Sequence, residues 1–206
     1  MSTTGLAVPP GRAGRLWLLQ RLAVADRTAG LLDRKLQVLA TELDRLRAAT
    51  ERTGQQWDTA CREAQRTLLR AVLLGGERAV RLAGGPADAQ VTISYTVTMG
   101  ARHPATARYS TAEPDAWAGA AVAAARQAHR AALAAAARHA AASAAVAVIE
   151  AETTTTRYRL RAVRDRWIPQ LTQALAEAEL VLDEMERDDA ARLRIARRDP
   201  TRRGAV

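Results

Sequence analysis

The sequence predicts an all-α fold, in which a long antiparallel two-helix coiled coil carries a small β-hairpin in the middle of the chain. The first observation is an apolar seam from Leu18 to Leu74 with a repeat of about 3.5 residues, typical of a helix wound against a partner helix. The second is a similar repeat from Ile168 to Met185. The third is that the only β-like sequence, residues 90–98, lies between these stretches. The simplest topology therefore folds the second helix back along the first.

The first long helix is predicted at residues 14–75, after a tail at residues 1–13 that lacks an apolar period and is expected to be disordered. No Pro interrupts the seam, and its only Gly residues before Gly75 are Gly30 and Gly54, so the segment can form one continuous helix. Such a helix far exceeds the average of about 11–12 residues. The residues predicted to form this half of the coiled-coil seam are Leu18, Leu22, Ala25, Ala29, Leu32, Leu36, Leu39, Leu43, Leu46 and Trp57.

The middle region, residues 76–117, is predicted to contain a β-hairpin at about residues 90–111. Apolar and polar residues alternate in its first half, the period of a half-buried strand. Residues 99–104 are interpreted as a turn and residues 105–111 as the returning strand. Because an isolated hairpin is marginally stable in water, we expect it to pack on the helices or on a partner. Joints are predicted at Gly75, Gly76, Gly84, Gly85 and Pro86.

The second long helix is predicted at residues 118–197, where an alanine-rich beginning favours helix. A bend or break is expected near residues 153–169, because Thr153 opens a β-branched run and Pro169 lacks a backbone donor. Residues 198–206 form a basic tail that is expected to be disordered. The predicted seam residues of this helix are Ile168, Leu171, Leu175, Ala178, Leu182 and Met185.

The sizes of the seam residues suggest a register for the two helices. Placing the leucine-rich ends together puts Leu32 near Leu171 and Leu175, and Trp57 near residues 146–149. Small residues then face the alanine-rich stretch, where the helix axes are expected to approach most closely.

Composition limits the class of protein. The single cysteine, Cys61, excludes an internal disulfide framework and fits a reducing compartment. No secretory leader is evident, and Arg126, Arg130 and Arg138 interrupt the longest weakly charged stretch. These features predict a soluble, cytoplasmic chain without direct membrane insertion.

The net charge of +9 raises the possibility of a nucleic-acid partner. The positive charge is almost all Arg, with Lys35 as the lone Lys, and it is spread along both helices. No basic block precedes a zipper, and no finger or RNA-recognition motif is present. Nucleic acid is therefore not the favoured partner. A basic antiparallel coiled-coil adaptor that binds nucleic acid or an acidic protein remains the alternative function.

No catalytic, cofactor-binding or metal-binding residues are predicted. There is no phosphate-binding glycine loop, and His129 and His139 lack the spacing of metal ligands, so both are interpreted as exposed. Cys61 has no helical His neighbour to activate it. An acidic cluster from Asp183 to Asp189 is interpreted as a solvated face, offset by Arg187 and Arg192, or as a contact with a protein. The four tryptophans, Trp17, Trp57, Trp117 and Trp167, are interpreted as packing residues, and an exposed one would mark an interface.

Three motifs in the correct order carry a family resemblance. The chain resembles the D subunits of V-type and A-type rotary ATPases, the family of the central-stalk shaft, over nearly its whole length. The first motif comprises Arg21, Leu22, Ala25, Arg27, Leu31, Leu32, Lys35 and Leu39. The second is Met99, Gly100 and Pro104, which are similar to the family's hairpin turn. The third comprises Ile168, Pro169 and Leu171, then Leu182, Asp183, Glu184, Glu186, Arg187, Asp188, Asp189, Arg192 and Leu193.

The chain departs from the family pattern at a few positions. Thr28 replaces a usual Gly, and Asp33 replaces a usual Lys. Before Ile168 the family usually has Asn-Ala-Leu-Glu, where this chain has Arg161, Ala162, Val163 and Arg164. The reversed charges at Asp33 and Arg164 put specific partner contacts in question, although not the helical architecture.

The resemblance implies a non-catalytic rotor shaft without a cofactor. Its partners would be the ATPase head hexamer of catalytic and regulatory subunits, a small F-type stalk subunit near the hairpin, and a subunit connecting it to the membrane rotor. ATP hydrolysis or synthesis in the head would be coupled to translocation of an ion, expected to be the proton, with the complex on the cytoplasmic side of the cell membrane. Possible partner contacts are Arg27, Lys35, Asp183, Glu184, Arg187 and Arg192.

Overall fold

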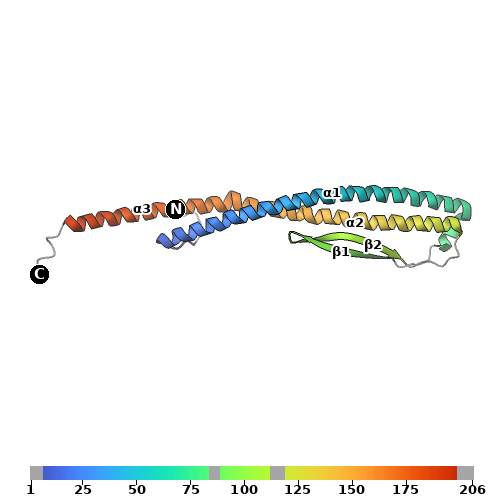
Figure 1. The fold of residues 1–206 in the computed structure, drawn as a ribbon, viewed down its shortest axis with the longest axis horizontal. Helices are drawn as coiled ribbons and strands as arrows, with labels where there is room; N and C mark the ends of the chain where they lie inside the picture. Colours follow the sequence, from blue (N-terminus) through green and yellow to red (C-terminus); the bar gives the residue numbers. More distant parts are fainter. Residues whose placement is uncertain (1–6, 84–88, 112–118, 199–206) are drawn as a thin grey trace. The chain divides into compact units, whose positions relative to one another are not determined.

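The computed structural model describes residues 7–83, 89–111 and 119–198. The elements are helix α1 (Gly11–Ala83), strands β1 (Ala89–Thr98) and β2 (Ala101–Thr111), helix α2 (Ala120–Arg161), π-helix η1 (Ala162–Trp167) and helix α3 (Ile168–Arg198) (Figure 1). The predicted class, long helices with a small hairpin in mid-chain, is confirmed. The predicted joint at residues 84–86, Trp117 and the tail at residues 199–206 lie outside the described residues.

The chain divides into two compact units, which we describe separately. Unit 1 comprises Met1–Arg34 and Thr156–Val206, and unit 2 comprises Lys35–Thr155. In unit 1, the beginning of α1 pairs with α3 through a buried cluster of Leu18, Ala25, Leu171 and Ala174. Leu18 and Leu171 are fully buried, and each buried Leu contributes about 1.5–3 kcal/mol.

Unit 2 contains the rest of α1, paired with α2. One cluster joins Leu39, Leu43 and Leu46 of α1 to Ala145 and Ile149 of α2. A second cluster, with much smaller side chains, joins α1 and α2 near the end of α1 and consists of Ala71, Ala83, Val122 and Ala125.

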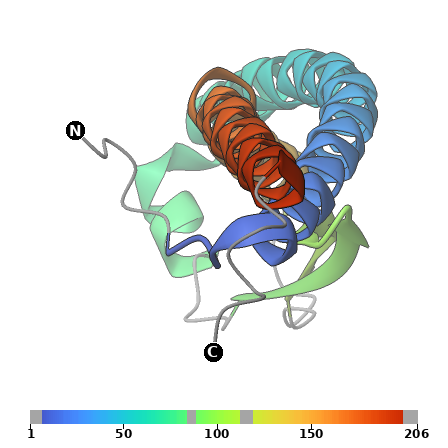
Figure 2. The ribbon, with the colours of Figure 1, turned by 90° about the vertical axis from the view of Figure 1, so that its left-hand side faces the viewer.

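Helix α1 kinks at Gly76. Its φ of 73° and ψ of 160° are not helical, and the positive φ is readily adopted only by Gly. The helical turns after Gly76 leave the line of the preceding helix (Figure 2). Arg126 of α2 donates a hydrogen bond to the carbonyl of Ala83, the last residue of α1. This bond satisfies a carbonyl that a helix end leaves without an intrahelical partner.

Helix geometry changes between α2 and α3. The β-branched run at residues 153–156 is helical, with the hydroxyl of Thr153 donating to the carbonyl of Ile149 at 2.7 Å. The irregularity lies at η1, where the N–H of Ile168 donates to the carbonyl of Val163, five residues earlier. Pro169 follows directly. Because Pro has no N–H and its ring clashes with the carbonyl four residues back, a widened turn here relieves the helix.

The turn of the hairpin is shorter than predicted, and the buried residues lie in the second strand rather than in the first. The turn is confined to Met99 and Gly100, whose φ values of 50° and 88° are typical of a two-residue type I′ turn, and β2 begins directly at Ala101. Every residue of β1 except Thr98 is exposed, so the expectation of a half-buried first strand is wrong. The buried residues of the hairpin are Ala101, His103 and Ala107, all in β2.

The helices are antiparallel within each unit, but their register differs from the predicted one. Leu171 packs with Leu18 and Ala25 rather than with Leu32. Trp57 lies against His139, about two helical turns before the predicted partners at residues 146–149. Size matching failed because Ala recurs so often in α2 that many registers place small residues together.

The stretch Ala120–Arg197 is long and apolar enough, by length and composition alone, to cross a membrane. Its hydropathy comes largely from alanine. Five of these alanines are buried within the helix pairing of unit 2: Ala125, Ala132, Ala135, Ala141 and Ala145.

Candidate functional site

Ion pairs link the two helices of unit 1. Arg12 of α1 contacts Glu186 of α3 at 2.9 Å, and Arg15 contacts Glu179 at 2.8 Å. Both pairs are well exposed, and such pairs contribute about 0–1 kcal/mol each. Their main effect is on register, because a slip of one turn would separate each charge from its partner.

A third ion pair in unit 1 joins two residues at which the resemblance implied a reversed charge. Arg164 of η1 donates to the carboxylate of Asp33 on α1 at 2.6 Å. The sequence flagged these two residues separately as charge reversals. The structure shows that they are one another's partners. Both charges are therefore engaged with each other inside unit 1.

Unit 2 has two interhelical ion pairs of its own. Lys35 contacts Glu152 at 2.6 Å, and Arg47 contacts Glu150 at 2.6 Å. The pair of Lys35 and Glu152 is about three-quarters buried on both sides, the least exposed of the interhelical pairs among the described residues. The predicted partner contact Lys35 is thus engaged inside the chain.

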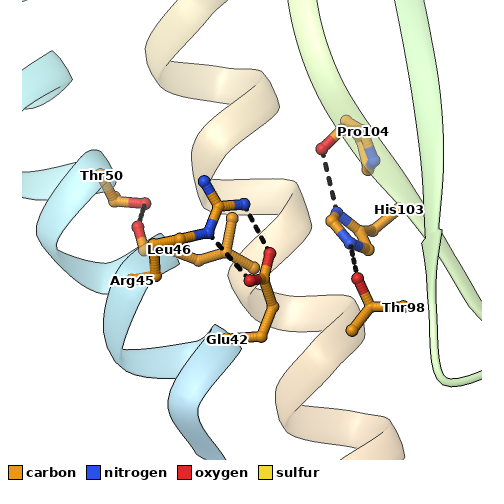
Figure 3. A network of polar contacts seen from close by, with 7 residues as sticks. All are labelled: Glu42, Arg45, Leu46, Thr50, Thr98, His103 and Pro104. Carbon is orange, nitrogen blue, oxygen red and sulfur yellow. Dashed lines mark hydrogen bonds and ion pairs between the residues drawn. The ribbon is translucent and has the colours of Figure 1, made fainter. Parts of the chain in front are cut away.

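Polar side chains of the hairpin and of α1 form two hydrogen-bonded groups, one around His103 and one around Glu42 (Figure 3). His103, only 1% exposed, bonds through Nε2 to the Thr98 hydroxyl at 3.0 Å and through Nδ1 to the Pro104 carbonyl at 3.1 Å. Because a carbonyl only accepts, Nδ1 carries the hydrogen. On α1, Arg45 donates two hydrogen bonds to Glu42, at 2.8 and 2.6 Å. These bonds, with the charges of Arg45 and His103, lower the pKa of Glu42 below its ordinary value, and burial acts against them.

A stacked aromatic pair marks the middle of unit 2. The Trp57 and His139 rings stack with centroids 5.5 Å apart, and His139 Nδ1 lies 3.3 Å from the Thr53 hydroxyl. Gly54 lies against the same imidazole ring, because a Cβ added at Gly54 would be 3.4 Å from Cε1 of His139. The interpretation of His139 as an exposed residue is therefore wrong. Sequence spacing could not reveal this, since the pairing depends on the register.

The predicted seam residues differ in burial. Leu22, Leu32, Leu36, Ile168, Leu175, Ala178 and Leu182 are half-buried, whereas Leu18, Ala25, Ala29, Leu39, Leu43, Leu46 and Leu171 are buried. Trp57 and Met185 are exposed by 38% and 54%, so they lie at the margins of the helix contact. Trp17 is half-buried beneath Arg21, and Trp167 is 39% exposed.

The other predicted partner contacts lie on the surface of unit 1. Glu186 of the acidic cluster pairs with Arg12 across the helices rather than with its neighbours in sequence. The exposed members of the predicted set are Arg27, Asp183, Glu184, Arg187 and Arg192.

The described residues contain no His, Cys, Asp and Glu group that could hold a metal ion. Cys61 is a half-buried free thiol. An open groove of about 530 Å³ lies between α1 and α2 in unit 2, lined by Arg52, Gln55, Gln56, Thr59, Ala60, Glu63, Ala128 and Ala131. Among the lining residues, the Thr59 hydroxyl donates to the carbonyl of Gln55 and Glu63 pairs with Arg66, so no bond joins this hydroxyl to this carboxylate.

Comparisons with known proteins agree with this arrangement. The family model for the D subunit of ATP synthase matches residues 16–198. The chain is also 31% identical over 193 residues to the V-type ATP synthase D subunit of Anaeromyxobacter dehalogenans (strain 2CP-C), covering 89% of this chain and 92% of that relative. The matched range includes both helix pairs and the hairpin.

Proposed function

The chain belongs to the family of ATP synthase D subunits, and from that premise we propose that it is the central-stalk rotor subunit of a V/A-type rotary ATPase. In this role it transmits torque between ATP hydrolysis or synthesis in the head and translocation of an ion, taken to be the proton, across the membrane. It performs no chemistry itself.

The observation that supports the proposal is the lateral bonding of helix pairs in both units. A torque-bearing element must resist twisting, and two helices resist it when side chains join them at several levels. In unit 1 the contacts that join the helices are the apolar cluster around Leu18 and Leu171 and three ion pairs. In unit 2 they are two apolar clusters and two ion pairs. Packed interiors transmit strain because they are dense and nearly incompressible.

The partners proposed for this rotor are the head hexamer of catalytic and regulatory subunits, a small F-type stalk subunit and the subunit that connects to the membrane rotor. The complex would place the chain on the cytoplasmic side of the cell membrane without inserting it. The exposed charges at Arg27, Asp183, Glu184, Arg187 and Arg192 are proposed as partner contacts.

The experiment is purification of the tagged chain from native membranes in mild detergent, combined with ATP-driven acidification of inverted vesicles. We expect a stoichiometric complex with P-loop ATPase subunits, and loss of acidification in a deletion strain that the wild-type gene restores. Acidification that persists without the chain would contradict the rotor role. Recovery with nucleic acid, with an affinity that falls steeply as salt rises, would instead support the basic adaptor.

A further inference from the structure

Strand β1 presents an unprotected edge and an uncovered apolar row. Val91, Ile93, Tyr95 and Val97 alternate along β1, so they share one face of the strand, and they are 43–63% exposed. Single exposed apolar residues are ordinary on a protein surface, but four in one row on a two-stranded sheet are not.

The two edges of the hairpin differ in their protection. Natural sheets block free edges with charges, Pro or bulges, because an open edge pairs readily with another strand. Strand β2 has Arg102, Pro104 and Arg108, and the register shift opposite Ser94 and Tyr95 leaves an extra residue in it. Strand β1 has ten residues, with neither a charge nor a Pro among them. In the described residues the sheet has only these two strands, so the outer edge of β1 pairs with no third strand.

Charge indicates the kind of segment that fits this edge. Residues 89–111 contain Arg102 and Arg108 but no Asp or Glu. Arg102 lies over the Tyr95 ring, 4.4 Å from its centroid, on the face that carries the apolar row. A carboxylate on an added strand could therefore form a charge-assisted hydrogen bond with Arg102 at the margin of the apolar row.

We propose that β1 is a docking edge for an extended, acidic segment of a partner protein, which adds to the hairpin as a third strand. Main-chain hydrogen bonds along β1 supply affinity, while the apolar row and Arg102 select apolar and acidic side chains in alternation. The inference rests on the proposed rotor role only in that the partner is sought among subunits of the same complex.

The first test replaces Tyr95 with the photo-cross-linker benzoylphenylalanine, an aromatic side chain of similar shape, in the full chain within the purified complex. Tyr158, an exposed tyrosine at 65%, is the matched control site on a helix. We expect the Tyr95 site to capture one extended peptide of another subunit, with acidic and apolar residues alternating, and the Tyr158 site not to capture it. Capture of a second copy of this chain, of nucleic acid or of a helical peptide would overturn the proposal.

Amide hydrogen exchange gives an independent readout. We expect the amides of β1 to exchange more slowly in the complex than in the free chain, and the double variant V91T/V97T to weaken this protection about tenfold. The control V24T/V38T makes the same chemical change at two exposed valines of α1 and should leave β1 protected. If the complex assembles and β1 exchanges as fast as in the free chain, docking is refuted while the rotor role stands. If no complex is recovered, the rotor role itself fails.

Discussion

Unit 1 and the part of unit 2 near the end of α1 both pair α1 with an antiparallel helix, but they bury side chains of very different size. In unit 1 the contact is centred on Leu18 and Leu171, which pack in one cluster and are closed to solvent. Near the end of α1 in unit 2 it consists of Ala71, Ala83 and Ala125 around the single larger Val122. Leucine contacts stabilise through buried area, whereas alanine contacts stabilise through close approach and helix propensity. The two regions should therefore fail in opposite ways, one when side chains shrink and the other when they grow.

Truncation should damage unit 1 most. Leu171→Ala removes a fully buried side chain, so we expect a loss of about 3–5 kcal/mol in the free energy of unfolding, measured by urea denaturation of the full chain. Leu69→Ala, at a residue that is 62% exposed, is the control and should cost far less. Equal losses in the two variants would mean that the leucine cluster is not the stabilising contact.

Enlargement should damage the alanine contact. Ala71 is fully buried, so Ala71→Leu forces the helices apart, with an expected loss of about 1–3 kcal/mol in the same denaturation. The exposed Ala123 of α2 is the control position, where Leu should be tolerated. If Ala71→Leu leaves the free energy of unfolding unchanged, the alanine contact is not closely packed.

The ion pair of Asp33 and Arg164 should show compensation. Either single reversal, Asp33→Lys or Arg164→Glu, should cost up to about 1 kcal/mol at low salt by placing like charges together. The double reversal should recover most of that loss, since it restores an opposite pair. Additive losses in a double-mutant cycle would show that the two residues do not interact.

The smallest expected effect is a pH dependence in unit 2. Because the hydrogen bonds from Arg45 lower the folded-state pKa of Glu42, its contribution to stability is present above the unfolded pKa and is lost as pH falls through the folded value. Between about pH 5 and about pH 3, stability should therefore decline less in Glu42→Gln than in wild type. If the difference in the free energy of unfolding between the two proteins stays constant across this range, Glu42 does not contribute to the pH dependence.

Sequence patterns predicted the long helices well, because α1 and α3 have an apolar repeat and α2 is rich in alanine, which favours helix. It placed Leu18 and Leu171 among the buried contacts, but it could not determine which residues face each other. Register depends on side-chain pairs such as Trp57 with His139, whose partners are far apart in sequence. Alternation located the hairpin, but the prediction that its first strand is half-buried was wrong. Alternation shows only that the two faces of a strand differ, and it does not say which of the two strands packs against the helices.

The π-helical turn at η1 also accommodates one extra residue between successive seam positions. In unit 1 the covered positions run through Thr156, Leu160 and Val163 in steps of four and three, then step by five to Ile168 and by three to Leu171. In a regular α-helix one surplus residue would rotate everything after it by about 100° and turn the later leucines away from α1. The widened turn absorbs that residue, so both sides of it keep the same face toward the partner helix. The segment is therefore a place where evolution could gain or lose one residue without rewriting the rest of the helix.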